Sequence, residues 1–324
     1  AAGFIVVAAG RPRRGRRFDY RPAAGYHRHR PRGCRSRGVA HPLLHVVVRR
    51  EPGTRHLDAV TPPAQRRSAR AIDVDRDLQL EPGRDYDALR ITASGITLDG
   101  QGACIAGSSF TGRAIEADGV DGVTLRNVSV RGFETGLHLS HAHGWLIENC
   151  DFSDNFHDPD FGWGENGRRG GIVLVSVRDS ILRGNRANRV WDACGLYACD
   201  EVEITGNDFS HASNTCLKLW QSSRNVVLAN NLSYGIRLAP GEVHARDSAG
   251  LLLEHASNEN RVVGNNITHG GDGVFIRLLS SLPSSGNYFE DNDASYANNN
   301  CFEAWAPNST YAVSYTHLRA HETG

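Results

Sequence analysis

Lys218 is the only lysine in this chain of 324 residues. An ammonium group can lose its proton near neutral pH when it is removed from water, whereas a guanidinium group stays protonated. A β-eliminating lyase requires a base of this kind. The alternatives are a solvated surface charge or an ion pair with Glu254. An outward-facing Lys218 would in either case contribute little to stability.

Charged and aromatic side chains recur at equivalent places around Lys218. Glu254 and Arg277 either form a surface ion pair or take part in catalysis, and Glu254 with Glu303 could serve as an acid and base with room for a water. Aromatic rings beside charges suit sugars, which stack on rings and hydrogen-bond through their hydroxyl groups. The candidate catalytic residues are Lys218, Glu254, His244 and Arg277. The candidate substrate-binding residues are Tyr197, Trp220, Phe275, Trp305, Arg168, Arg169 and Glu242.

A first insertion, residues 156–170, is rich in glycine and acidic residues. Its carboxylates suit calcium, which prefers oxygen ligands, although such loops also form ordinary turns. Arg168 and Arg169 could clamp a substrate carboxylate in a bidentate manner, or pair with acids of the same loop. The possible calcium ligands are Asp158, Asp160 and Glu165.

A second insertion, residues 235–247, carries the densest set of titratable groups. His244 is a candidate general acid or base because the ordinary pKa of histidine lies near neutral pH. A structural hydrogen-bonding role for His244 is the alternative. The residues of the set are Glu242, His244, Arg246 and Asp247, joined by His269 and Asp272.

The elements that position these residues are short repeats. The clearest copies read Gly-apolar-x-apolar, with Cys216 in the place of Gly in one of them, and are followed after about ten residues by an apolar-x-x-Asn turn. Strands of three to five residues are too short to form a sheet alone, so stacked copies must share one core. An asparagine that recurs at one turn can form a ladder of amide hydrogen bonds. The predicted ladder comprises Asn185, Asn207, Asn230, Asn265 and Asn292.

These repeats resemble the right-handed parallel β-helix proteins of the pectate-lyase-like superfamily. The resemblance covers roughly residues 72–312 and implies an all-β solenoid of about nine coils. It also implies that loops at one corner wall a groove over the first sheet. Some members use a Lys or Arg base in that groove, with acids or calcium neutralising a uronate. The resemblance further implies that the protein is exported. The motif is architectural, so it implies a fold more strongly than an activity.

Alternation along the strands predicts which side chains face outward. Both insertions precede a Gly-apolar strand, which places them at one corner, three coils apart, about 14 Å at the spacing of parallel strands. Together they should flank the groove. One predicted outward row is Glu116, His138, Val173, Tyr197, Lys218, Leu252, Phe275 and Glu303; the next is Asp118, Ser140, Val175, Cys199, Trp220, Glu254, Arg277 and Trp305.

The two ends differ from the repeats. Residues 1–70 are rich in Arg and Pro and contain no Lys. We interpret them as a disordered or mistranslated segment; a natural basic tail or a nucleic-acid arm is the alternative. Residues 313–324 are expected to be non-native, because 313–323 resemble a translated sequencing adapter. The β-helix domain, residues 71–312, is then cut in mid-solenoid.

Two function classes remain open. The first is a carbohydrate-active enzyme that degrades an acidic polysaccharide by elimination or hydrolysis, with calcium as the one possible cofactor. The second is a non-catalytic β-helix that binds carbohydrate or serves as a spacer at the cell surface or in the periplasm. No apolar run is long enough to span a membrane. We expect a monomer, outside the cytoplasm, with a polysaccharide or oligosaccharide and no nucleic acid as its partner.

Overall fold

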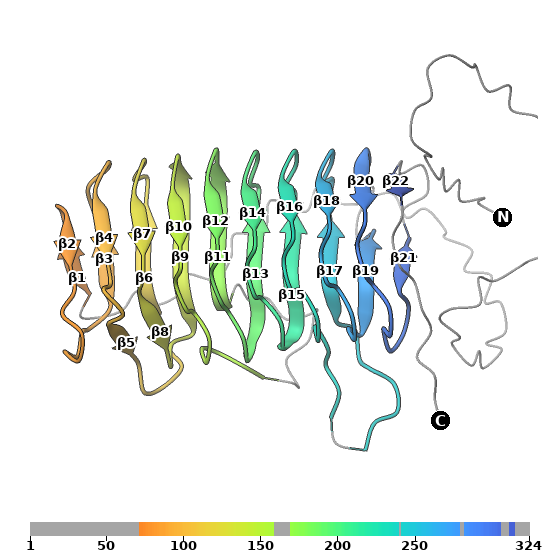
Figure 1. Ribbon diagram of the computed structural model, residues 1–324, viewed down its shortest axis with the longest axis horizontal. Coiled ribbons are helices and arrows are strands. Elements are labelled where there is room, and N and C mark those ends of the chain that lie inside the picture. The colour runs from red at the N-terminus through yellow and green to blue at the C-terminus, as the bar shows by residue number, and fades with distance from the viewer. Residues whose placement is uncertain (1–70, 159–168, 240, 279–281, 306–310, 315–324) are drawn as a thin grey trace, which may run out of the picture.

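The computed structural model describes residues 71–158, 169–239, 241–278, 282–305 and, as backbone alone, 311–314. Residues 1–70 and most of the C-terminal tail lie outside these ranges, so the interpretations of both ends stay predictions. The described residues form a stack of parallel coils along one long axis (Figure 1). They contain no helix that could cross a membrane. The predicted all-β, right-handed parallel β-helix is confirmed.

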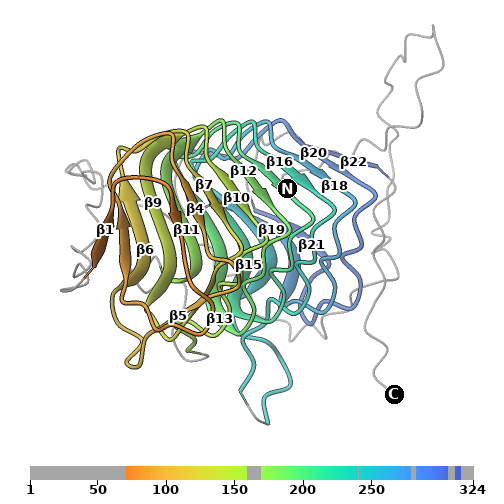
Figure 2. The same ribbon diagram turned by 60° about the vertical axis from the view of Figure 1, so that its left-hand side comes forward.

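Two ten-stranded sheets run the length of the stack, and every pairing in them is parallel. The turned view in Figure 2 shows the coils one behind another. The first sheet contains β1 (Ile72–Val74), β3 (Leu89–Ile91), β6 (Arg113–Asp118), β9 (Thr135–His143), β11 (Gly170–Arg178), β13 (Val190–Tyr197), β15 (Ala212–Trp220), β17 (Ala249–Glu254), β19 (Asp272–Arg277) and β21 (Phe302–Ala304).

The second sheet follows the first along each coil and consists mostly of three-residue strands. It contains β2 (Leu78–Gln79), β4 (Thr97–Asp99), β7 (Thr124–Arg126), β10 (Leu146–Glu148), β12 (Ile181–Arg183), β14 (Glu203–Thr205), β16 (Val226–Leu228), β18 (Arg261–Val263), β20 (Asn287–Glu290) and β22 (Tyr311–Ser314). β22 includes Val313 and Ser314, which pair with Phe289 and Glu290.

The third side of the coil is narrower. It begins with β5 (Cys104–Ala106) and β8 (Ser129–Arg131) and continues as single parallel bridges. Those bridges run from Ser129 through Asp151 and Arg186 to Asp208 and then through Asn231 and Asn266 to Asp293. The side chains at the last four of these places, from Asp208 to Asp293, accept hydrogen bonds from a Ser or Thr two residues on, as Asn231 does from Ser233. The Asn-x-Ser/Thr triplets here are therefore turn elements.

The predicted asparagine ladder is present in full. The Oδ1 atom of Asn230 accepts hydrogen bonds from the backbone N and the Nδ2 of Asn207, both at 2.9 Å. Its Nδ2 donates to the carbonyl of Ile204 at 2.8 Å and to Oδ1 of Asn265 at 3.0 Å. The same pattern links Asn185 to Asn207 and Asn265 to Asn292. Each amide thereby satisfies buried backbone groups that would otherwise lack partners.

A second asparagine ladder was not predicted from the sequence. Asn225, Asn260 and Asn287 repeat the same pattern at the turn between the first and second sheets, and each amide donates to a carbonyl of the coil before it. A serine line lies beside it, in which the hydroxyl of Ser257 accepts from the backbone N of Ser222. The polar turns on both sides of the second sheet are thus internally satisfied.

We expect Asn230→Ala to destabilise the solenoid by on the order of 3 kcal/mol, because it leaves several buried polar groups without partners. Asn266→Ala, at an exposed place one residue after the ladder, should cost about 1 kcal/mol or less. Urea and thermal unfolding of both variants would compare the two losses. Equal losses would contradict the importance of the buried ladder.

Candidate functional site

The outward face of the first sheet holds six of the predicted site residues: Tyr197, Lys218, Trp220, Glu254, Phe275 and Arg277. Lys218 lies in a row with Gly195 before it and Leu252 after it, and the row continues to Phe275 and Glu303. The next row contains Tyr197, Trp220, Glu254 and Arg277 in adjacent strands.

The predicted rows are wrong for β13, where the sequence repeat was aligned on its glycine. Tyr197 pairs with Trp220 and not with Lys218, and Cys199 lies beyond the strand as a buried thiol. The shift is two residues long, so within β13 it preserves the inward or outward direction of each side chain. Tyr197 therefore still faces outward, one place further along. Cys199, which was predicted to face outward, instead belongs to the main core.

Gly195 gives the Tyr197 ring its position. A Cβ atom at Gly195 would lie 2.9 Å from Cε2 of Tyr197 and 3.2 Å from its hydroxyl oxygen. The ring thus folds back over the glycine toward the row of Lys218. The Lys218 Nζ lies 5.9 Å from the centre of the Tyr197 ring and 5.4 Å from that of Trp220. Both rings can therefore attract the ammonium through their π faces.

Glu254 is the centre of a charge cluster on this face. Its Oε2 lies 3.5 Å from Nζ of Lys218, and its Oε1 accepts a hydrogen bond from Nη1 of Arg277 at 3.2 Å. The side chain of Glu254 is 1% exposed, that of Lys218 10% and that of Arg277 16%. Glu254 thus forms both ion pairs that the sequence analysis considered as alternatives to catalysis, one with Lys218 and one with Arg277. Both ion pairs are largely buried.

The expectation of a neutral Lys218 is not supported. Burial acts to lower the pKa of Lys218, but the charges of Tyr197, Glu254 and Asp192 outweigh it, so that the pKa is raised. The ammonium form is therefore favoured, and the nearest negative group is the carboxylate of Glu254, 3.5 Å from Nζ. Burial also removes the reason for expecting Lys218 to contribute little to stability, since a buried ion pair is costly to break.

Aromatic side chains surround this cluster. Trp220 stacks on His255 with ring centres 3.7 Å apart, and burial lowers the pKa of His255. Phe275 and Trp305 meet edge to face, with ring centres 4.8 Å apart. Phe275 is 2% exposed and packs with Ala249 and Leu252 in a small apolar cluster separate from the main core, whereas Trp305 is 53% exposed. Of these two rings, Trp305 is the one that a ligand can reach.

Asp192 is a member of the site that the sequence reasoning missed. Its Oδ1 accepts hydrogen bonds from Nδ2 of Asn214 at 2.7 Å, from the backbone N of Thr215 at 3.0 Å and from the Thr215 hydroxyl. Burial raises the pKa of this carboxyl, although Lys218 and these hydrogen bonds act in the opposite direction. The sequence signal that could have identified Asp192 is that it is the single acidic residue of the otherwise uncharged strand β13.

A second pair of acids lies toward the C-terminal end of the face. The Nδ2 of Asn300 donates to Oδ1 of Asp272 at 3.3 Å and to Oε2 of Glu303 at 2.9 Å. Burial, followed by the charge of Glu303, raises the pKa of Asp272 to about 7. The indole Nε1 of Trp305 donates to Oε1 of Glu303 at 2.6 Å. Glu303 is thus linked to Asp272 through Asn300, whereas Glu254 pairs with Lys218 and Arg277. The structure therefore groups Glu303 with Asp272 and not with Glu254, the partner considered from the sequence.

The first insertion is described only at its ends. Asp158 is partly buried, and its carbonyl accepts a hydrogen bond from Ser213. Arg169 pairs with Glu134 at 2.9 Å and lies over the ring of Phe156, so its partner comes from the preceding coil. Calcium binding and the arginine clamp stay predictions, and the described residues contain no cluster of three potential metal ligands. The predicted site residues outside the described ranges are Asp160, Glu165 and Arg168.

The second insertion protrudes between β16 and β17 (Figure 1). Glu242 accepts hydrogen bonds from the backbone N of Ala239 and from Arg246, both at 2.9 Å, so its visible role is to fix the loop. The backbone N of Ala245 donates to Oδ1 of Asn298. His244 and Asp247 are exposed.

The two insertions lead into strands of the same sheet. The first ends at β11 and the second at β17, three coils apart, as the sequence predicted. Whether they wall a groove over Lys218 stays a prediction, because the middle of the first insertion lies outside the described residues.

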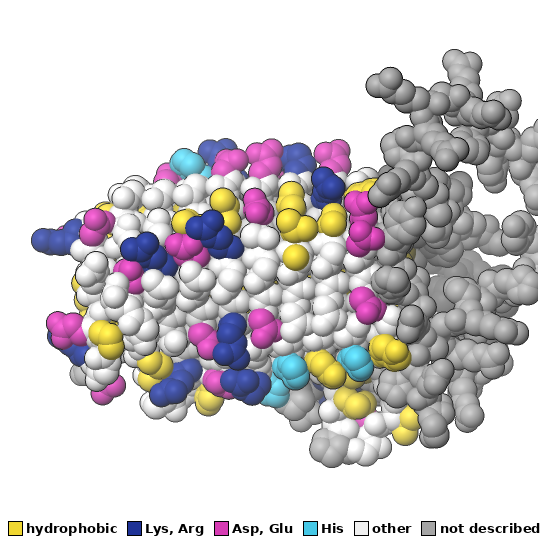
Figure 3. All heavy atoms as spheres, in the orientation of Figure 1, with side chains coloured by type: hydrophobic (Ala, Val, Ile, Leu, Met, Phe, Trp, Pro, Cys, Tyr) yellow, Lys and Arg dark blue, Asp and Glu magenta, His cyan; other side chains and the backbone are white. Residues whose placement is uncertain are grey.

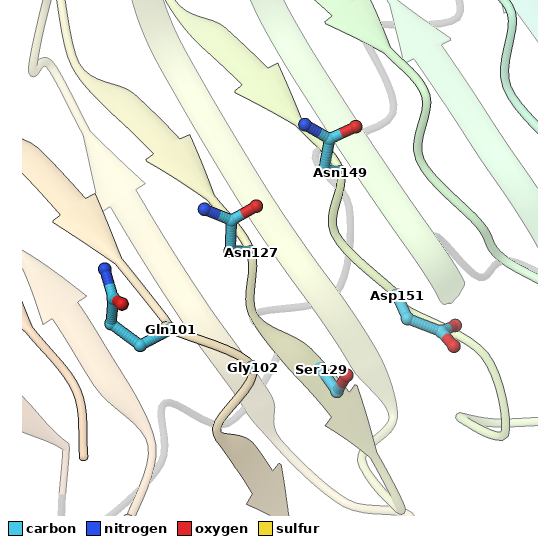
Figure 4. Close-up of a pocket in the computed structure, with 6 residues that line it drawn as sticks. All are labelled: Gln101, Gly102, Asn127, Ser129, Asn149 and Asp151. Atoms are coloured by element: carbon cyan, nitrogen blue, oxygen red, sulfur yellow. The ribbon is translucent and has the colours of Figure 1, made fainter. Parts of the chain in front are cut away.

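A separate open depression lies on another part of the surface (Figure 4). It has a volume of about 410 Å³ and contains none of the predicted site residues. Its three amide side chains occupy left-handed turn positions, with φ between 51° and 55°. The lining residues are Gln101, Gly102, Asn127, Ser129, Asn149 and Asp151.

The described part of the chain is a right-handed parallel β-helix protein with a charged, aromatic outer face on its first sheet. Residues 87–233 match a family model described as "Right handed beta helix region". A comparison with curated protein sequences found no match.

Several solved structures are similar to this chain. The periplasmic alginate epimerase AlgG is 12% identical, with a TM-score of 0.52; the match covers 71% of this chain and 50% of that one. An alginate lyase from Paenibacillus sp. is 13% identical, with coverage of 74% and 92% and a TM-score of 0.45. The A-module of the mannuronan C-5 epimerase AlgE6 from Azotobacter vinelandii is 16% identical, with coverage of 75% and 88% and a TM-score of 0.40. This chain thus spans about half the length of AlgG, and the likeness shows the fold alone.

We expect Glu254→Gln to destabilise the protein by about 3–5 kcal/mol, because it leaves two largely buried cations without their shared counter-charge. A double variant, Glu254→Gln with Lys218→Met, should recover part of the loss. Glu201→Gln, whose partner Arg224 is half exposed, is the matched surface control and should cost about 1 kcal/mol or less. Thermal unfolding of these variants and of Lys218→Met alone would test this. Additive losses would show that Lys218 and Glu254 are not coupled.

The raised pKa of Asp272 predicts a pH dependence of stability. An unfolded Asp ionises near pH ~3.9, whereas the folded Asp272 keeps its proton up to about pH 7. Between these values the folded state binds the extra proton, so stability should fall as pH rises, by at most about 1.4 kcal/mol per pH unit. Asp272→Asn should lose this component. A variant whose free energy of unfolding differs from that of the unchanged protein by a constant amount from about pH 4 to 8 would contradict it.

Proposed function

We propose that this protein acts on an acidic polysaccharide whose chain lies over the outer face of the first sheet. The observation that supports this most is the cluster in which Lys218 and Arg277 flank Glu254 beside the rings of Tyr197 and Trp220. Cations can bind the carboxylate of a uronic acid residue, and the rings can contact the faces of its sugar. The substrate named for AlgG makes alginate a reasonable first choice for testing.

The chemistry that best suits this cluster is removal of the proton from C5 of a uronate. That carbon is adjacent to the carboxylate, so negative charge develops on the carboxylate oxygens when the proton leaves. Lys218 and Arg277 are cations that can stabilise this charge. Tyr197 carries the oxygen that can accept the proton, because the ammonium of Lys218, 5.9 Å from the centre of its ring, favours the ionised form of the phenol.

Two outcomes can follow that first step. Departure of the glycosidic oxygen from C4, which takes up a proton from water as it leaves, forms a C4–C5 double bond and breaks the chain; this is elimination. Return of a proton to the opposite face of C5 inverts that carbon, which is epimerisation. In both, Lys218 acts as a charge and not as the base that the sequence suggested.

Hydrolysis is a second candidate, and the Asp272–Glu303 pair favours it. Two carboxyl groups with different proton affinities can serve as the acid and the base of a glycosidase. Asp272 holds its proton to about pH 7, and Asn300 bridges it to Glu303. The exposed Trp305 next to Glu303 can contact a sugar. In this candidate function Asp272 takes the place that the sequence gave to Glu254 as the partner of Glu303.

A non-catalytic role is the remaining alternative, because Glu254 already pairs with both Lys218 and Arg277. In that case the face binds carbohydrate without changing it. An extracellular or periplasmic location fits either role and is part of the proposal.

One assay separates these possibilities. A panel of uronic acid polysaccharides, with and without calcium, would be incubated with the protein in D₂O. Elimination gives ultraviolet absorbance of the unsaturated product, hydrolysis gives reducing ends without that absorbance, and epimerisation gives deuterium at C5 without chain cleavage. Binding without any of these changes would support the non-catalytic role. Absence of binding to every polyuronate would reject the proposed function.

Lys218 variants test the role of the charge. Lys218→Met should reduce turnover at least about 100-fold, because transition-state charge then lacks its ammonium. Lys218→Arg should keep measurable activity, since guanidinium is also cationic. Tyr197→Phe should be as inactive as Lys218→Met if Tyr197 is the base. Steady-state rates and melting temperatures would be measured together, and an inactive Lys218→Arg of unchanged melting temperature would restore Lys218 as the base.

A further inference from the structure

Four aromatic side chains stack along the corner where the third side of the coil meets the first sheet. We call them the His–Tyr row: His211, Tyr234, His269 and Tyr296. Their ring centres are 4.7, 4.8 and 5.2 Å apart, and neighbouring ring planes are within 14–22° of parallel. In Figure 3, histidine side chains alternate with side chains of the hydrophobic class, which includes Tyr, along the lower edge of the viewed face.

The backbone of the row is held in a conformation that these residues rarely adopt. All four have positive φ values, between 58° and 61°. Histidine and especially tyrosine occupy this left-handed region at a cost that glycine or asparagine would avoid. None of the four belongs to the hydrophobic core, and His211 and Tyr234 are exposed. Burial in the core therefore does not account for rings at this place.

Stacking between coils explains why the His–Tyr row consists of aromatic rings. It does not explain why two of these rings, those of Tyr234 and Tyr296, carry hydroxyl groups. Phenylalanine would stack equally well at the two tyrosine positions, without an exposed polar group. The hydroxyl groups of Tyr234 and Tyr296 make no hydrogen bond to a described residue. The ring faces inside the row contact one another, so a ligand between the ends of the row meets ring edges. Rings already ordered by stacking lose little freedom when they bind.

We propose that the His–Tyr row is an outer binding track for the polysaccharide of the proposed function, with the tyrosine hydroxyls hydrogen-bonded to its sugar residues. The row supplies one ring edge per coil, about 4.8 Å apart, in a straight line parallel to the stack. An extended glycan presents hydroxyl groups at a comparable regular interval. The track lies beside the face that holds Lys218, because Tyr234 directly precedes the second insertion and His211 directly precedes β15.

Toward the N-terminus, the same corner carries an ion pair with no net charge in place of aromatic rings. Arg189 and Asp154 occupy the equivalent places in the two preceding coils, with positive φ, and are joined by two hydrogen bonds of 2.6 and 2.7 Å. This pair and the uncharged phenols favour hydroxyl groups of the glycan as the main contacts of the track. The inference depends on the proposed function, since it names a second contact surface for the same polymer.

The test compares long and short ligands. In Tyr234→Phe/Tyr296→Phe the rings and their stacking remain and only the two hydroxyls are lost. Binding of alginate and the other polyuronates of the panel would be measured by calorimetry, next to their trisaccharides. The double variant should bind the polymers about 3–10-fold more weakly, as expected for lost hydrogen bonds, and the trisaccharides as before. Tyr288→Phe, on the second sheet, is the control and should change neither.

The outcomes separate this inference from the proposed function. If the double variant binds polymers as the unchanged protein does, while Lys218→Met weakens trisaccharide binding, the track alone is overturned. An equal loss for polymer and trisaccharide also overturns it, because the row would then belong to the site around Lys218. A protein that binds no polyuronate overturns both. The melting temperature of the double variant should equal that of the unchanged protein, since stacking is retained.

Discussion

The structure depends on satisfying the polar groups of turns that are buried between coils. Each coil has few residues in any strand, so no coil is stable alone and all must stack. The asparagine ladder makes that stacking possible at one turn, because each amide accepts from the coil before it and donates to the coil after it. The second ladder through Asn260 does the same at another turn. With the turns fixed, the pitch of the stack is fixed as well.

A fixed pitch turns distant residues into neighbours in straight rows. Lys218, Glu254 and Arg277 belong to three successive coils and meet because β15, β17 and β19 pair in register. The 35-residue step between Asn230 and Asn265 does not disturb this register, because the extra residues leave the coil at a corner and return before β17. Insertions can therefore vary around a face that the strands keep constant.

Burial changes the chemistry of that face. Lys218 points away from the core and yet has little contact with solvent, so its charge interacts strongly with Glu254 and Asp192. The same effect raises the pKa of Asp272 beside Glu303. A face of this kind can hold charges in defined protonation states, which both elimination and hydrolysis require. The fold itself is shared with proteins of 12% identity and does not select between them.

The sequence alone determined the solenoid, its asparagine ladder and the outward direction of the site residues. These follow from local period and from a residue type that recurs at one turn, and both can be read along the chain. The second ladder through Asn225 was missed because it has only three asparagines. Such a short series, in turns that also contain serines, does not stand out as a repeat in the sequence. Only the tertiary structure decided which outward side chains are neighbours and what charge they carry. A two-residue shift in β13 placed Tyr197 beside Trp220. Negatively charged neighbours raise the pKa of the buried Lys218 and favour its ammonium form. Register between coils and the depth of a side chain depend on contacts across the stack, and a single repeat does not contain them.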